Sequence, residues 1–173
     1  MTLDLPDPCL VVLIGPAGSG KSTLAGRLLR PTEVVSSDAC RAAVADDPRA
    51  RDADADAFAL VHRIVAARLR RGLTVAVDAT NVHRRSRRTL LALARAHGRP
   101  ATAVVLDLPL ELCVERDLFR GDAAVGADVV RTQRRLLERT LAGLDTEGFA
   151  QVVTLRTSAE VDAFRIVRTP ETA

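Results

Sequence analysis

Residues 15–22 read Gly-Pro-Ala-Gly-Ser-Gly-Lys-Ser and fit the pattern G-x-x-x-x-G-K-[ST]. The run before them, Cys9 to Ile14 (CLVVLI), is continuously apolar, as is typical of a strand buried inside a parallel sheet. The stretch after the glycines, Lys21 to Leu29, has helical character and ends before Pro31. A glycine-rich turn between a strand and a helix lets backbone amides close around phosphate oxygens, at which the helix points its positive end. The three segments together predict a site for the phosphates of a nucleotide.

The side chains of this turn supply a cation and a metal ligand. Lys21 is the single lysine among the 25 basic residues, and all the others are arginines. Its ammonium is expected to reach the outer phosphates of a nucleotide, and the Ser22 hydroxyl to ligate Mg²⁺. ATP and Mg²⁺ are therefore the expected ligands. The predicted ATP contacts in this segment are Gly15, Pro16, Ala17, Gly18, Ser19, Gly20, Lys21, Ser22 and Thr23.

Strand-like and helix-like segments alternate along the rest of the chain. This alternation predicts an α/β protein with a parallel sheet covered by helices on both faces. The further strands are expected at Glu33–Ser36, Leu73–Val77, Ala101–Leu106 and Gln151–Leu155. Helices are expected at about 38–45, 54–71, 84–97, 110–120, 128–141 and 158–167.

Length and composition restrict the class of protein. A chain of 173 residues with 47% hydrophobic and 27% charged residues can bury a sizeable core, and we expect a single domain over residues 1–173. The net charge of +3 is compatible with anionic substrates but too small to establish nucleic-acid binding. The three cysteines form no C-x-x-C pair, and no apolar run approaches the roughly 18 residues of a membrane span. A soluble, cytoplasmic protein with reduced thiols is expected.

Two aspartates follow predicted strands at the edge where open α/β sheets bind ligands. Asp38 comes just after the second strand, and Arg41 lies on the same helical face three residues later. An ordinary surface pair of this kind would contribute only about 0.3 kcal/mol. A phosphotransferase, however, needs a carboxylate that accepts the proton of the acceptor hydroxyl and cations near the moving phosphoryl group. Asp78, at the end of the third strand, is placed to steady the water shell of Mg²⁺ or an arginine on the acceptor side.

Arg116 and Arg120 lie four residues apart on a predicted helix, where like charges repel each other. Glu115 and Asp117 could simply screen them. A phosphate bound between the two guanidinium groups is the alternative, because their planar forks suit phosphate oxygens.

Four elements in this order resemble those of the polynucleotide 5′-hydroxyl kinases, above all the kinase module of bacterial RNA end-healing and repair enzymes. They are Gly15–Ser22, Ser37-Asp38-x-x-Arg41, Asp78-Ala-Thr-Asn81 and Arg116-x-x-x-Arg120. The resemblance runs from about Leu10 to Gln133 and more loosely to Pro170. It implies a P-loop kinase fold with five parallel strands in the order 2-3-1-4-5 and a helical, arginine-bearing lid at about residues 113–128.

The resemblance also implies a reaction and a role for each matching residue. The reaction is transfer of the γ-phosphoryl group of ATP to the 5′-hydroxyl of RNA or DNA. Asp38 would be the general base, Arg41 would contact the acceptor and the transferred phosphate, and Asp78 would orient Arg41. Arg116 and Arg120 would clamp the ATP phosphates. The implied catalytic residues are Lys21, Asp38, Arg41 and Arg116, and the implied acceptor-binding residues are Asp38, Arg41, Asp78, Asn81 and Arg87.

Partners and other functions stay open at this stage. Repair enzymes of this kind continue into phosphatase and ligase domains, so such domains or other repair proteins are expected partners, and both a stand-alone kinase and an excised module are compatible with the sequence. Arg84, Arg85, Arg87 and Arg88 form either a solvated helix face or a groove that follows a nucleic-acid backbone. The alternative functions are a kinase for a small-molecule hydroxyl (nucleoside, sugar or antibiotic) and a nucleotide-binding toxin-like or regulatory module.

Overall fold

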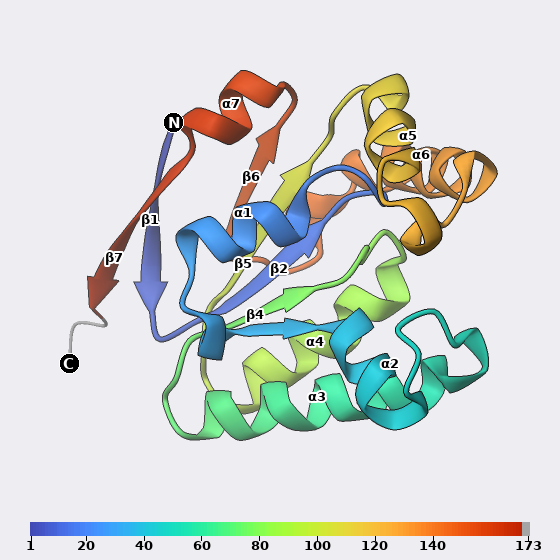
Figure 1. Ribbon diagram of the computed structural model, residues 1–173. Helices are drawn as coiled ribbons and strands as arrows, with labels where there is room; N and C mark the ends of the chain where they lie inside the picture. The colour runs from blue at the N-terminus through green and yellow to red at the C-terminus, as the bar shows by residue number, and fades with distance from the viewer. Residues whose placement is uncertain (171–173) are drawn as a thin grey trace.

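Parallel strands form a central five-stranded sheet in the computed structural model, which describes residues 1–170 (Figure 1). The order across this sheet is β3-β4-β2-β5-β6. Counted along the chain as in the sequence analysis, this is the predicted order 2-3-1-4-5, which is confirmed. The strands are β2 (Leu10–Ile14), β3 (Val34–Ser36), β4 (Val75–Asp78), β5 (Ala101–Leu106) and β6 (Gln151–Leu155).

Helices cover both faces of the sheet, also as predicted. They are α1 (Lys21–Leu28), α2 (Ser37–Ala45), α3 (Asp54–Arg70), α4 (Arg84–Ala96), α5 (Leu110–Leu118), α6 (Ala127–Leu141) and α7 (Ser158–Ala163). No helix within residues 1–170 combines the length and the apolar character that a membrane crossing requires.

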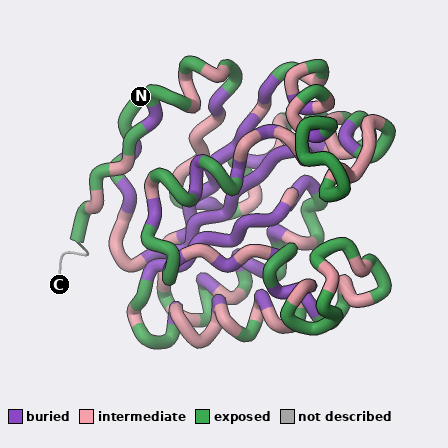
Figure 2. The backbone as a smooth tube through the Cα atoms, in the orientation of Figure 1, coloured by how far each residue is buried: buried purple, intermediate pink, exposed green. Residues whose placement is uncertain are grey.

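The central strand β2 contributes to two separate cores because its side chains alternate between the faces of the sheet. Leu10, Val12 and Ile14 pack with the buried sides of α3 and α4. Val11 and Leu13 pack instead with α1 and with the strands at the two ends of the described chain. Figure 2 shows the resulting band of buried residues along the middle strands. With both faces covered, β2 holds the loop that follows it in a fixed position.

The sequence analysis was wrong about the last helix. α7 ends at Ala163, and residues Arg165–Pro170 form a strand, β7, that pairs in parallel with β1 (Thr2–Asp7) in a separate two-stranded sheet. Phe164 is fully buried between the two elements and joins Leu3 and Leu5 in the core on the α1 side. The pairing joins segments more than 160 residues apart, so no local pattern could have indicated it.

Arg168 on β7 links this second sheet to the rest of the protein through hydrogen bonds to Glu33. Arg168 donates hydrogen bonds to both carboxylate oxygens of Glu33, at 2.8 and 2.6 Å, and to Asp7 at 3.2 Å. Burial acts to raise the pKa of Glu33, but the bonds from Arg168 and from the Arg30 backbone outweigh it and lower the pKa. A bond from Thr74 and the bonds from Arg168 likewise lower the pKa of Asp7.

Replacing Arg168 with glutamine should lower the free energy of unfolding at neutral pH by about 2 kcal/mol, because it leaves the buried Glu33 carboxylate without its partner. The lowered pKa values mean that this stabilisation is present above the unfolded-state pKa values and is lost as pH falls through the folded-state values. Chemical denaturation of both proteins at pH about 7 and about 3 should therefore show the difference shrinking in acid. Arg63→Gln, an exposed arginine on α3, is the control; an equal loss in that variant would contradict the explanation.

Candidate active site

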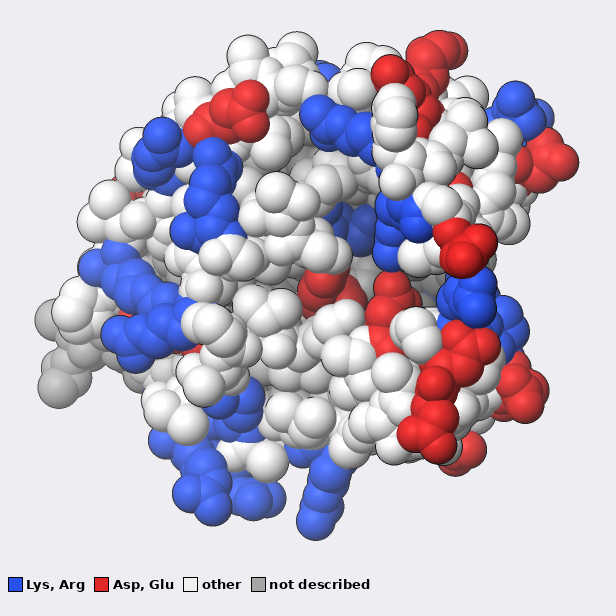
Figure 3. All heavy atoms as spheres, viewed as in Figure 1, with Lys and Arg blue, Asp and Glu red and all other residues white. Residues whose placement is uncertain are grey.

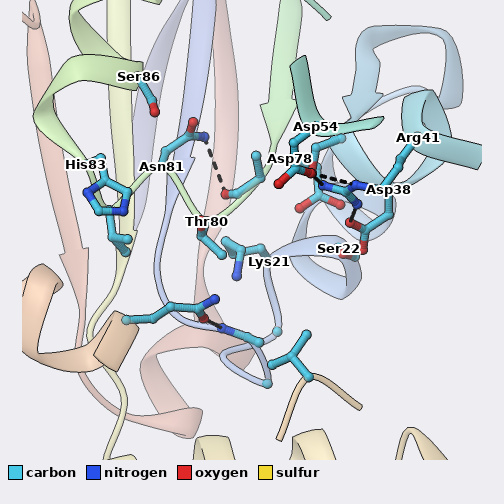
Figure 4. A pocket seen from close by; sticks show the side chains of 18 of the residues that line it. Lys21, Ser22, Asp38, Arg41, Asp54, Asp78, Thr80, Asn81, His83 and Ser86 are labelled. Atoms are coloured by element: carbon cyan, nitrogen blue, oxygen red, sulfur yellow. Dashed lines mark hydrogen bonds and ion pairs between the residues drawn. The ribbon is translucent and has the colours of Figure 1, made fainter. Parts of the chain in front are cut away.

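A pocket of about 630 Å³ opens at the carboxyl ends of the central strands. Figure 3 shows a hollow in this region with basic side chains above it and acidic side chains below it. In Figure 4, Lys21 lies near the middle of the pocket, Asp38 and Arg41 lie on one side, and Asn81, His83 and Ser86 lie on the other. The predicted site residues that line it are Ala17, Gly18, Gly20, Lys21, Ser22, Thr23, Asp38, Arg41, Asp78, Asn81, Arg116 and Arg120.

The glycine-rich loop is packed tightly against neighbouring backbone. A Cβ atom added to Gly18, whose φ is +74°, would lie 2.0 Å from the carbonyl oxygen of Cys113 on α5. One added to Gly15 would lie 2.9 Å from the carbonyl oxygen of Leu106 at the end of β5. Only glycine permits this approach at either position. α5, the helix that carries Arg116, therefore packs directly against the loop.

Lys21 is held inside the loop rather than in solvent. Its side chain is buried, and its ammonium donates hydrogen bonds to the Pro16 carbonyl at 2.7 Å and to the Ser19 hydroxyl at 3.4 Å. Burial lowers the pKa of Lys21 to about 8, although the nearby Asp78 carboxylate opposes this shift. The protein therefore presents a partly desolvated cation whose charge an incoming phosphate would stabilise.

Asp38 and Arg41 meet as predicted, but a second carboxylate that the sequence analysis did not identify holds the arginine. Arg41 is 2% exposed; its guanidinium donates to Asp38 at 2.8 Å, to Asp54 at 2.8 Å and to the Pro48 carbonyl at 2.7 Å. The resemblance implied that Asp78 would orient Arg41; within residues 1–170 Asp54 at the start of α3 does so instead. The reason is the fold, since α2 and α3 pack together and bring Asp54 to Arg41.

Asp78 and Asn81 are fixed at the end of β4, beside the loop. Asn81 adopts a left-handed conformation with φ +47°, and its side-chain amide donates to the Leu13 carbonyl at 2.8 Å. Two residues from Asp78, the Thr80 carbonyl accepts a hydrogen bond from the Gly15 backbone at 3.0 Å. The segment after β4 is thus joined to the phosphate loop by one backbone hydrogen bond and to β2 by the Asn81 side chain. Asp78 is buried and lines the pocket, and its carboxylate is near enough to Lys21 to act on the pKa of that lysine.

The two predicted lid arginines reach the pocket from above the loop. Arg116 donates to the Ser158 hydroxyl at 3.2 Å, and Arg120 lies 3.9 Å from the Asp38 carboxylate. Arg49, in the segment between α2 and α3, donates to the Asp122 carbonyl in the turn after α5. The segment predicted to be a lid therefore spans the pocket and contacts its opposite wall. Its opening and closing remain a prediction.

The sequence analysis did not identify several further residues that line the pocket. Gln133 on α6 accepts a hydrogen bond from the Ala17 backbone at 2.7 Å, although it lies 116 residues further along the chain. Phe58, His83 and Ser86 complete the wall on the α3 and α4 side. None belongs to a motif, so their position follows only from how α3, α4 and α6 pack.

Arg87 corrects the predicted acceptor-binding set. Its side chain is fully buried, and two of its nitrogens donate to Glu147 at 2.8 and 2.6 Å while the third donates to the Asn81 carbonyl at 2.8 Å. All three nitrogens thus donate to protein groups, and Arg87 does not line the pocket. Arg87 supports the turn at Asn81 by donating to its carbonyl. It therefore belongs neither to a solvated helix face nor to a surface that could contact an acceptor.

The residues present fit a magnesium ion that is held mainly by a nucleotide. Within the described residues, no group of three or more His, Cys, Asp or Glu side chains could hold a metal ion. Ser22 and Asp78 both line the pocket that holds Lys21. Mg²⁺ is usually bound through few protein ligands together with phosphates and water, which agrees with this arrangement.

The strand, the glycine-rich loop and the site below it define a nucleotide-binding domain with the P-loop kinase fold. A profile of the AAA domain family (AAA_33) matches residues 10–140, so the chain belongs to that family.

Similar proteins cover a range of functions. The chain is 29% identical over 157 residues to "Transcription factor bHLH140" of Arabidopsis thaliana and spans 16% of that protein. Among solved structures, one chain of the Pnkp1/Rnl/Hen1 RNA repair complex is 26% identical, with a TM-score of 0.67 over 78% of this chain and 45% of that one. A gluconokinase from Sinorhizobium meliloti 1021 is 20% identical, with a TM-score of 0.58 over 91% of this chain and 87% of that one.

The lowered pKa of Lys21 leads to a prediction about nucleotide binding. Phosphate oxygens should restore the charge of Lys21, so ATP binding should take up a proton: about a quarter of a proton near pH 7.5 and close to a whole one near pH 9, given a pKa of about 8 in the free protein. Affinity should fall as pH rises above 8 for the same reason. Calorimetry in buffers of different ionisation enthalpy measures the uptake. Equal uptake near pH 7.5 and 9 would contradict the assignment.

Proposed function

We propose that this domain is an ATP-dependent kinase that transfers the γ-phosphoryl group to the 5′-hydroxyl of a polynucleotide. The observation that carries the proposal is the Asp38–Arg41 pair in the pocket that also holds Lys21. Arg41 is buried and fixed by Asp54, whereas Asp38 remains 56% exposed to the pocket. A fixed cation beside an accessible carboxylate is what transfer of a phosphoryl group to a hydroxyl requires.

The roles on the donor side follow from position. The backbone amides of residues 15–22, Lys21 and the lid arginines would hold the phosphates of ATP, and Ser22 would hold Mg²⁺, which neutralises charge on the phosphates when bound. Arg116 lies on α5, which packs on Gly18, and Arg120 lies in the turn that follows α5, so the two arginines would contact the nucleotide from the same side.

The roles on the acceptor side fall to the other half of the pocket. Asp38 would accept the proton of the acceptor hydroxyl, and Arg41 would stabilise charge on the transferred group. In the nucleotide-free structure, Asp38 is also close to Arg120 at 3.9 Å.

The choice of a polynucleotide rests on the ordered motif set and on the likeness to the RNA repair complex, which matches at 26% identity. The likeness to the gluconokinase concerns the fold alone and leaves a small-molecule hydroxyl as the second candidate acceptor. The two candidates differ in how many phosphates accompany the reacting hydroxyl. An acceptor panel can therefore separate them.

The panel should contain 5′-hydroxyl RNA, 5′-hydroxyl DNA, nucleosides and sugars, each incubated with Mg²⁺ and ATP labelled at the γ-phosphate. We expect label on the 5′ end of one or both oligonucleotides and little on nucleosides or sugars. Increasing salt should weaken the reaction with oligonucleotides steeply, because phosphate contacts release counterions. Transfer to a sugar or nucleoside alone would replace the proposed function with the second candidate.

Replacing Asp38 with asparagine should lower kcat by about 10²–10⁴-fold, since it removes the proton acceptor but keeps the size of the side chain. ATP affinity should change little, because Asp38 lies on the acceptor side. Steady-state kinetics and nucleotide titration measure the two effects. Asp52→Asn is the matched control, an exposed aspartate nearby that does not line the pocket. Wild-type turnover by the Asp38 variant would rule out the general-base role.

A further inference from the structure

Three arginines on α4 form an exposed basic surface beside the pocket. Arg84, Arg85 and Arg88 are exposed, whereas Arg87, between them in sequence, points into the core. We call the three exposed residues the α4 arginine surface. Arg87 has a structural partner in Glu147, and the arginine surface therefore needs an explanation of its own.

The electrostatic setting of this surface is unfavourable for the isolated domain. The first turn of α4 contains no acidic residue, and arginines there meet the positive end of the helix dipole. Arg84 and Arg88 also repel each other at a spacing of four residues. Glu147 is the nearby carboxylate, but Arg87 occupies it at 2.6 Å, and Arg84 approaches it only to 3.7 Å. A row of cations placed in this way gains stability when an external anion binds.

The arginine surface begins beside the wall of the pocket that lies across from Asp38 and Arg41. His83 and Ser86, which line the pocket, flank Arg84 and Arg85 in the chain. Figure 4 shows both side chains on the wall opposite Asp38 and Arg41. Successive residues of a helix point about 100° apart, so Arg85 lies next to Ser86 around α4, whereas Arg84 and Arg88 lie further round the helix. A strand that leaves the pocket past Ser86 would meet Arg85 first and would follow the surface of the first turn to reach the other two.

The opposite rim of the pocket carries charges of both signs: Arg49 and Arg51 are exposed there, and Arg51 lines the pocket, but exposed aspartates outnumber them. Asp46, Asp52 and Asp56 are exposed around the end of α2 and the start of α3. Figure 3 shows acidic side chains gathered in that region. A polyanion is repelled along the α2–α3 rim and attracted along α4, so the charge distribution selects one exit path from the pocket.

We propose that Arg84, Arg85 and Arg88 bind the sugar–phosphate backbone of a single-stranded polynucleotide whose 5′ end occupies the pocket. This proposal rests on the proposed function and adds the direction in which the acceptor strand leaves the site. The contacts are to phosphates, so they fix the position of the strand without reading its sequence. A small-molecule acceptor would not extend to this surface.

The test compares Arg85→Gln/Arg88→Gln with Arg70→Gln/Arg71→Gln. Both double variants lose two exposed positive charges, but Arg70 and Arg71 lie at the far end of α3. Arg84 is left unchanged because it also approaches Glu147. The acceptors are 5′-hydroxyl RNA and DNA strands from a nucleoside 3′-phosphate up to about twelve nucleotides, and thermal melting verifies that each variant is folded.

For the wild type, KM should fall as the acceptor lengthens. In the Arg85/Arg88 variant, KM for the longest strand should rise about tenfold with kcat unchanged, while KM for the nucleoside 3′-phosphate stays the same. The slope of log Kd against log salt should decrease by about 0.7 for each lost phosphate contact. The Arg70/Arg71 variant should behave like the wild type in all three measurements.

The outcomes separate this proposal from the one it rests on. If the wild type phosphorylates oligonucleotides but the Arg85/Arg88 variant keeps the wild-type length dependence and salt slope, the path over α4 is wrong and the proposed function stands. If both double variants lose affinity equally, the effect is one of net charge, and the path is again wrong. If the wild type phosphorylates no oligonucleotide, the proposed function fails and the path fails with it.

Discussion

All strands of the central sheet run in the same direction, and the site follows from that constraint. Parallel strands require crossover connections, so their carboxyl ends meet at one edge with the loops that leave them. The phosphate loop after β2, Asp38 after β3 and Asp78 at the end of β4 come from separate parts of the chain and meet there for this reason. The backbone bond from Gly15 to Thr80 shows how close the loops are. A different strand order would separate the carboxylates from the lysine.

The cations of the site are hydrogen-bonded to protein groups inside the pocket. Lys21 is bonded to a carbonyl of its own loop, Arg41 to two aspartates, and Arg116 to a serine hydroxyl. An unpaired buried charge is costly, so each cation has a protein partner before any ligand arrives. Binding of phosphates then exchanges partners rather than creating new charges.

Arginines close together in the sequence have different physical roles in the structure. Arg87 is fully buried and braces the Asn81 turn through Glu147, while its neighbours on α4 face solvent. Arg168, at the other end of the molecule, joins the terminal strands to Glu33. The planar guanidinium can make several directed bonds at once, which suits all these positions. Lys21 is the exception because a compact ammonium fits within the phosphate loop.

The central strand, the phosphate loop and the alternation of strands and helices could be predicted from sequence because their signals are local. An apolar run, glycines at fixed spacing and helical periodicity are properties of neighbouring residues. The pairing of Asp38 with Arg41 is local too, since both lie on one turn of α2. Other features were decided by the tertiary structure alone. Asp54 binds Arg41, and the Gln133 side chain accepts a hydrogen bond from the Ala17 backbone. Arg87 is buried, and Arg165–Pro170 forms a strand beside Thr2–Asp7. Each of these depends on which helix packs on which strand, and such contacts between distant segments leave no periodic pattern in the sequence.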